Sequence, residues 1–131
     1  TGKIAYPLME KRTQDSSPAA VVRIEQLYPF PHEQLESIFA SYPNLEGLRW
    51  VQEEPENMGA WSFVDARLWD RVTSRWSFAH AARFESGSPA SGSGLVHDQE
   101  HRELLEKAFE GLEQPGGESK PGDAPAPPPS A

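Results

Sequence analysis

The sequence has no cysteine among its 131 residues. This excludes a disulfide scaffold, a thiolate zinc site and a cysteine nucleophile. Basic residues are also scarce, because 12 Lys and Arg stand against 20 Asp and Glu and give a formal net charge of −8. An acidic chain is repelled by phosphate backbones, so we expect no nucleic-acid partner.

Long apolar runs are missing as well. No stretch approaches the roughly 20 residues that span a bilayer, so we expect no membrane partner. Residues 114–131 hold six prolines and three glycines but no aromatic or branched aliphatic residue. Such a segment cannot bury enough surface to offset its ordering entropy, which predicts a folded domain over 1–113 and a disordered tail over 114–131.

The hydrophobic periodicity of the rest alternates between helix and strand. The pattern predicts four helices and three strands, in the order helix 4–12, strand 19–27, helix 32–42, strand 48–52, helix 60–72, strand 75–84 and helix 98–112. Such alternation is typical of an α/β, three-layer fold with a mainly parallel sheet. Three strands make a thin sheet, and the chain opens without an initiator Met. We therefore expect that a first strand, just before Thr1, was lost by truncation.

The most informative stretch is QEEPENMGAW, which starts at Gln52 and directly follows a predicted strand. Its carboxylates Glu53, Glu54 and Glu56 lie where open α/β sheets place ligand sites. One interpretation is a general acid/base pair with split pKa values. The other, which composition favours, is an acidic loop that pairs with arginine on a neighbouring domain or subunit. A metal site is disfavoured, since Pro55 and the lack of a nearby His leave too few ligands.

Other polar motifs are weaker. Arg23 and Glu25 alternate with apolar residues, which indicates either an interface ion pair or a strand end that reaches solvent. The stretch 85–94 is rich in Ser and Gly but lacks both GxGxxG and a P-loop lysine. His97 and His101 have i, i+4 spacing without the Glu of HExxH, so solvent exposure is favoured over metal binding. The residues alone indicate an acidic α/β domain and no reaction.

Three motifs nevertheless occur in a familiar order: VRIEQLYPFP from Val22, WVQEEPENMGAW from Trp50 and RFESGSPASG from Arg83. Together with the opening TGKIAYPLMEKR, they resemble the C-terminal region of the thiamine-dependent component of 2-oxoglutarate dehydrogenase, over residues 1 to about 111. Two positions depart from the pattern of that family. Ala82 stands where the family usually has Gly, and Phe84 where it usually has Pro.

The resemblance implies a transketolase-like C-terminal domain. In that family, thiamine diphosphate and Mg²⁺ are held by two earlier domains at a dimer interface. The partners implied are the rest of the same polypeptide, a second subunit of a homodimer and the dihydrolipoyl succinyltransferase complex. The implied compartment is a bacterial cytoplasm, or a mitochondrial matrix if the source is eukaryotic. Two alternatives stay open, namely the same domain of a 2-oxoadipate dehydrogenase and a free-standing acidic interaction domain.

This resemblance assigns the segment a role in scaffolding and subunit contacts. We expect no catalytic, cofactor-binding or metal-binding residue in it, and we expect Trp61 to be buried against the sheet. The residues expected at a domain or subunit interface are Arg23, Glu25, Gln52, Glu53, Glu54, Asn57, Trp61, Arg83, Ser86 and Ser88.

Overall fold

A computed structural model of the chain describes residues 2–85, 87 and 93–112. Ser86, Ser88 and the tail 114–131 lie outside these described residues. The described elements follow in the order η1 (Gly2–Ile4), α1 (Ala5–Gln14), α2 (His32–Ala40), β1 (Gly47–Pro55), α3 (Trp61–Val72), β2 (Ser77–Arg83) and α4 (Gly94–Phe109). None of the described helices is both long and apolar enough to cross a membrane.

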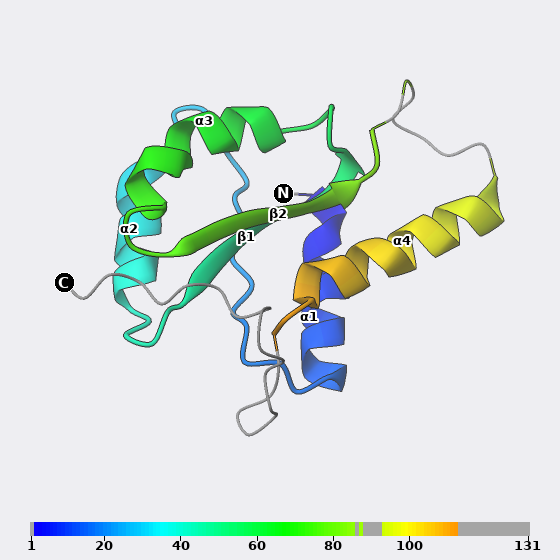
Figure 1. The fold of residues 1–131 in the computed structure, drawn as a ribbon, viewed down its shortest axis with the longest axis horizontal. Helices are drawn as coiled ribbons and strands as arrows, with labels where there is room; N and C mark the ends of the chain where they lie inside the picture. Colours follow the sequence, from blue (N-terminus) through cyan, green and yellow to red (C-terminus); the bar gives the residue numbers. More distant parts are fainter. Residues whose placement is uncertain (1, 86, 88–92, 113–131) are drawn as a thin grey trace.

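The two strands pair in parallel and form the middle layer of a small α/β domain (Figure 1). Helices α2 and α3 cover one face, where a core cluster includes Phe39, Trp50 and Val64. Helices α1 and α4 cover the other face, around Ile4, Ala81 and Leu104. Side chains alternate between the two faces along each strand, so a strand flanked by helices contributes to both clusters. This confirms the prediction of an α/β domain with a parallel sheet.

The predicted strand over 19–27 is wrong, because residues 17–28 form no strand in the structure. The segment still has two apolar sides: Ile24 is buried in the cluster under α2 and α3, while Val21 packs against the cluster under α1 and α4. No backbone hydrogen bond joins it to β1 among those recorded for the described residues. Alternating apolar residues favoured a strand, but an extended segment is a β-strand only where its backbone hydrogen-bonds to a neighbouring strand.

Helix α4 begins earlier than the apolar pattern predicted. The side chain of Ser93 accepts a hydrogen bond from the backbone N–H of Val96 at 3.2 Å, so Ser93 caps the helix. At the other end, Arg49 of β1 donates from Nη1 to the carbonyl oxygens of Lys107, Ala108 and Glu110, each at 2.9 Å. Burial lowers the pKa of Arg49, and the nearby Glu110 partly opposes this shift. Arg49 thereby ties the end of α4 to the sheet.

Candidate functional site

A bulge disturbs the pairing of the strands near their carboxyl ends. The register runs evenly from Gly47 opposite Ser77 to Val51 opposite Ala81, and then jumps to Pro55 opposite Arg83. Thus β1 takes four steps (51 to 55) where β2 takes two (81 to 83). The extra residues bend β1 away from the ladder and leave some of its carbonyl groups without a strand partner.

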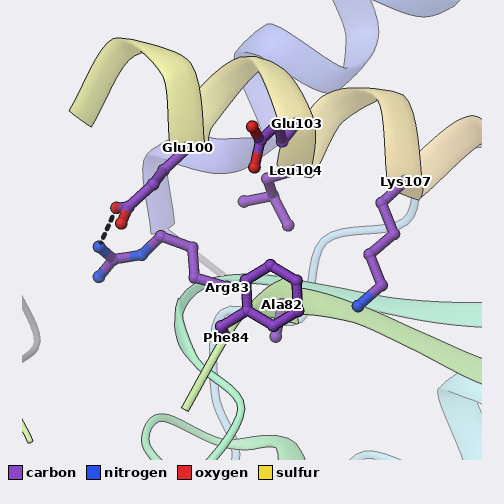
Figure 2. A pocket seen from close by; sticks show the side chains of 7 residues that line it. All are labelled: Ala82, Arg83, Phe84, Glu100, Glu103, Leu104 and Lys107. Atoms are coloured by element: carbon purple, nitrogen blue, oxygen red, sulfur yellow. Dashed lines mark hydrogen bonds and ion pairs between the residues drawn. The ribbon is translucent and has the colours of Figure 1, made fainter. Parts of the chain in front are cut away.

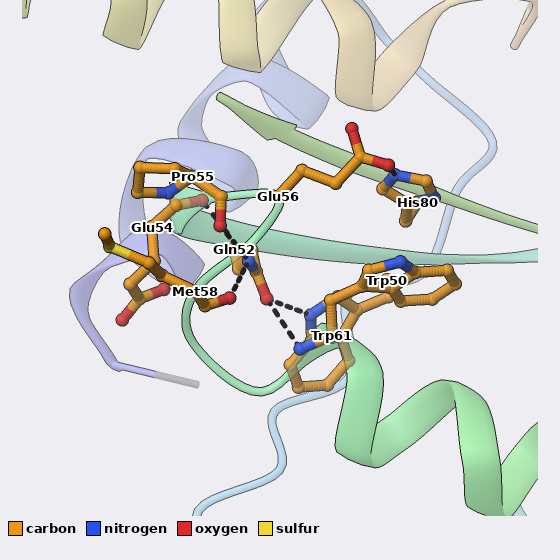
Figure 3. A network of polar contacts seen from close by, with 8 residues as sticks. All are labelled: Trp50, Gln52, Glu54, Pro55, Glu56, Met58, Trp61 and His80. Carbon is orange, nitrogen blue, oxygen red and sulfur yellow. Dashed lines mark hydrogen bonds and ion pairs between the residues drawn. The ribbon is translucent and has the colours of Figure 1, made fainter. Parts of the chain in front are cut away.

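Gln52 supplies partners inside this bulge, where it is only 2% exposed (Figure 3). Its side-chain amide nitrogen donates to the carbonyl oxygens of Glu54, Pro55 and Met58, at 3.3, 3.0 and 2.8 Å. Its oxygen accepts from the indole N–H of Trp50 and the backbone N–H of Trp61, both at 2.9 Å. One side chain therefore joins the bulge, the following turn and the first residue of α3.

The position of Gln52 on β1 explains why it points inward. Residues 48, 50 and 52 share one face of the strand, and Leu48 and Trp50 on this face pack in the core under α2 and α3. A buried amide is costly unless its hydrogen bonds are made. Gln52 makes them all, and the amide orientation is fixed because the groups around its oxygen are donors and those around its nitrogen are acceptors.

Gly59 closes the turn that Gln52 holds. Its φ is +67°, in the region that glycine adopts without strain. A Cβ placed on it would lie 3.0 Å from Cβ of Glu54 and 3.2 Å from Nε2 of Gln52. The turn is therefore packed too closely for a larger residue. This local geometry accounts for the glycine in EEPENMG.

A second layer of contacts covers this network. His80 of β2 lies 2.9 Å from the carboxylate of Glu56 through Nε2. The His80 ring stacks on Trp61, with ring centroids 4.1 Å apart and an interplanar angle of 23°. We expected Trp61 to be buried against the sheet; it packs against the core cluster under α2 and α3, but it is half-buried rather than buried. It is the first residue of α3.

The carboxylate of Glu54 lies beside the turn, with Oε2 3.1 Å from the position of a Cβ added to Gly59. Both Glu53 and Glu54 are exposed, and neither carboxylate has an ion pair recorded within the described ranges. Arg83 is adjacent, but its Nε donates to the backbone carbonyl of Glu53 at 2.6 Å and its Nη1 pairs with Glu100 of α4 at 2.8 Å. The loop thus presents two carboxylates on a backbone that Gln52 and Arg83 hold.

The structure brings most of the expected interface residues to this one end of the sheet. They are Gln52, Glu53, Glu54, Asn57, Trp61 and Arg83. Arg23 and Glu25 instead pair with each other at 3.3 Å in the irregular segment, where Arg23 also lies over the ring of Tyr6. Sequence reasoning missed the Glu56–His80 pair and the Arg83–Glu100 pair, because each joins elements far apart in the chain.

Comparisons with known proteins agree on one family. The family model described as 2-oxoglutarate dehydrogenase C-terminal matches residues 1–109. Among the relatives, the 2-oxoglutarate dehydrogenase E1 component of Cupriavidus necator is 39% identical over 110 residues, which cover 83% of this chain and 12% of the relative. That of a Geobacillus species is 38% identical over 116 residues, covering 87% and 12%.

The E1 component of Staphylococcus aureus is 36% identical over 110 residues, again covering 83% of this chain and 12% of the relative. The chain therefore spans about an eighth of the length of the curated relatives that it matches. The matched region includes every described helix and strand and the whole glutamine-held loop. The chain belongs to the 2-oxoglutarate dehydrogenase C-terminal domain family.

Proposed function

We propose that this chain is the C-terminal contact domain of a 2-oxoglutarate dehydrogenase E1 polypeptide. The observation that carries the proposal is the exposed Glu53–Glu54 pair on a loop held rigid by Gln52. Oxidative decarboxylation of 2-oxoglutarate in the tricarboxylic acid cycle, with succinyl transfer to a lipoyl carrier, would then belong to the rest of the polypeptide. The bacterial relatives favour a bacterial cytoplasm as the compartment.

The residues present here do not fit thiamine diphosphate or Mg²⁺. The loop at the carboxyl end of the strands carries Glu53, Glu54 and Glu56, whose charges repel a diphosphate. Within the part of the chain that the structure describes, no group of three or more His, Asp or Glu side chains is placed to hold a metal ion. We assign both cofactors to other domains of the polypeptide and derive no step through them.

We also propose that a strand preceding Thr1 completes the sheet. Two features of the middle layer support this: β1 pairs only with β2 among the described strands, and segment 17–28 offers apolar side chains to both helical layers without a ladder of its own. The short helix η1 lies against β1, so a preceding segment would arrive beside that strand.

The partner of the acidic loop is expected to be cationic. Glu53, Glu54 and Glu56 are like charges within four residues, with no basic residue between Gln52 and Ser62. An arginine from another domain or from the second subunit of a homodimer would relieve this repulsion, and such charge-assisted hydrogen bonds contribute about 1.5–3 kcal/mol. The succinyltransferase complex would engage the assembled enzyme rather than this loop alone.

The double substitution Glu53→Gln, Glu54→Gln in the full-length enzyme tests this proposal. We expect weaker dimerisation or lower stability, with near-normal turnover per intact dimer, because the substitutions remove charge and leave the fold unchanged. Analytical ultracentrifugation and steady-state turnover measure the two quantities. Glu46→Gln, Glu106→Gln is the matched control, since it removes the same charge from other exposed positions. An intact dimer whose turnover falls by about 100-fold would make the carboxylates catalytic and refute the docking role.

A further inference from the structure

Helix α3 packs on β2 and carries a row of three large or charged side chains on that side (Figure 1). Trp61, Asp65 and Trp69 follow one another at a spacing of four residues, so they share one face of the helix. Both tryptophan rings contact the ring of Phe78 on β2, with centroids 5.6 Å away for Trp61 and 6.4 Å away for Trp69. Asp65 therefore lies between two rings that border the same strand. We call these four residues the tryptophan–aspartate surface.

The carboxylate of Asp65 is incompletely satisfied. Its Oδ1 is buried, and it has no hydrogen-bond partner among the residues that the structure describes. No described Lys, Arg or His side chain forms a salt bridge with it. A carboxylate oxygen removed from water without a partner costs free energy, and a nearby positive charge offsets that cost. Asp65 therefore marks a place where a cation would be stabilised.

The flanking rings favour one kind of cation. Trp69 is 51% exposed, whereas one face of Trp61 is covered by the stacked ring of His80. A guanidinium group stacks well on an indole ring, and it is less strongly hydrated than an ammonium group. The molecule uses this contact elsewhere, since the guanidinium of Arg75 lies 4.1 Å from the ring centroid of Trp76. Within the described ranges, no cation is recorded over the ring of Trp69.

Other acidic side chains around β2 have partners inside the domain. On the face of β2 toward α4, Arg83 and Glu100 form an ion pair at 2.8 Å (Figure 2). On the face toward α3, the carboxylate of Glu56 lies 2.9 Å from Nε2 of His80. Among the described residues, Asp65 is the only acidic residue with a buried oxygen that lacks a partner. This distinguishes it from an ordinary acidic residue on a solvated helix face.

We propose that the tryptophan–aspartate surface binds the side chain of an arginine from a protein partner. The guanidinium would stack on the open side of Trp69 and donate a charge-assisted hydrogen bond to the carboxylate of Asp65. An arginine within a peptide chain fits better than free arginine, because the net charge of −8 repels the α-carboxylate of the free amino acid. The surface does not include Glu53 or Glu54, so it is independent of the proposed contact through the acidic loop.

Titration of this chain with N-acetylarginine methylamide, followed by the NMR signal of the Trp69 indole N–H, tests the proposal. We expect saturable binding with a Kd on the order of 10 mM, because one cation–π contact and one charge-assisted hydrogen bond are formed. N-acetylcitrulline methylamide has nearly the same shape without the charge. We expect this compound and free arginine each to bind at least about fivefold more weakly.

Substitutions on α3 test the role of the carboxylate. Asp65→Asn should weaken binding about tenfold, whereas Asp70→Asn, which removes the same charge from an exposed position, should change it less than about twofold. Without ligand, Asp65→Asn should raise the midpoint of thermal unfolding, because a neutral amide costs less to bury than an unpaired carboxylate.

Equal binding of the arginine and citrulline compounds would overturn the proposal, as would tighter binding of free arginine. Equal effects of Asp65→Asn and Asp70→Asn on binding would also overturn it, because they would reduce the effect to the overall charge. A lower unfolding midpoint for Asp65→Asn would contradict it as well, since the carboxylate would then be satisfied inside the domain. None of these measurements depends on dimerisation or on the Glu53–Glu54 substitutions.

Discussion

Replacing Gln52 with alanine is expected to lower the free energy of unfolding by about 3–5 kcal/mol, because several buried groups lose their hydrogen-bond partners together. The indole N–H of Trp50, the backbone N–H of Trp61 and three carbonyl groups all bond to this one side chain. Urea unfolding followed by tryptophan fluorescence measures the change. Gln34→Ala, at an exposed position on α2, should change stability by less than about 0.5 kcal/mol.

Gln52→Glu makes the test sharper. Glutamate keeps the shape of the side chain, but its second oxygen would face the carbonyl oxygens of Glu54, Pro55 and Met58. A buried charge against three acceptors cannot be satisfied, so this variant should be at least as destabilised as Gln52→Ala. A loss below about 1 kcal/mol at neutral pH would show that the amide network does not hold the loop.

Gly59→Ala is expected to cost about 2–4 kcal/mol. The residue has a φ of +67°, where an L-residue loses about 1–2 kcal/mol, and the new Cβ would press on Glu54 and Gln52. Gly111→Ala is the matched control, since Gly111 has a similar φ of +76° but no heavy atom of the described residues lies within 4 Å of an added Cβ. We expect the control to lose only about 1–2 kcal/mol. Thermal unfolding of both variants gives the difference, and equal losses would mean that the close packing at Gly59 contributes nothing.

The helices of this domain could be predicted from the sequence because their signals are local. Leu35 and Phe39 have i, i+4 spacing, and both are buried in the core. The boundaries were less accurate: α4 starts at Gly94 because Ser93 caps it, and a cap does not show in the apolar periodicity. The parallel pairing of β1 and β2 followed from the alternation of helices and strands.

The site was harder to predict, because its geometry is non-local. The acidic loop could be recognised from its motif, yet the bulge depends on Gln52 reaching carbonyl groups as far away as Met58. One signal was available: Gln52 shares a strand face with Leu48 and Trp50, and a polar residue on an apolar face must find partners inside. The prediction of a strand over 19–27 was wrong for the same reason, because strand pairing is also non-local. The apolar residues Val21 and Ile24 predict a segment with two apolar sides, but they do not supply a neighbouring strand to pair with.

In the proposed role, a rigid loop presents Glu53 and Glu54 to another part of the enzyme. Amide hydrogen exchange over residues 52–61, compared between the full-length protein and this chain alone, measures whether that contact forms. We expect Trp61, whose N–H bonds to Gln52 within the domain, to be protected equally in both. The backbone amides of Glu53, Glu54 and Asn57 should exchange at least about tenfold more slowly in the full-length protein than in this chain alone. Equal exchange at these three residues in the two proteins would contradict docking through this loop.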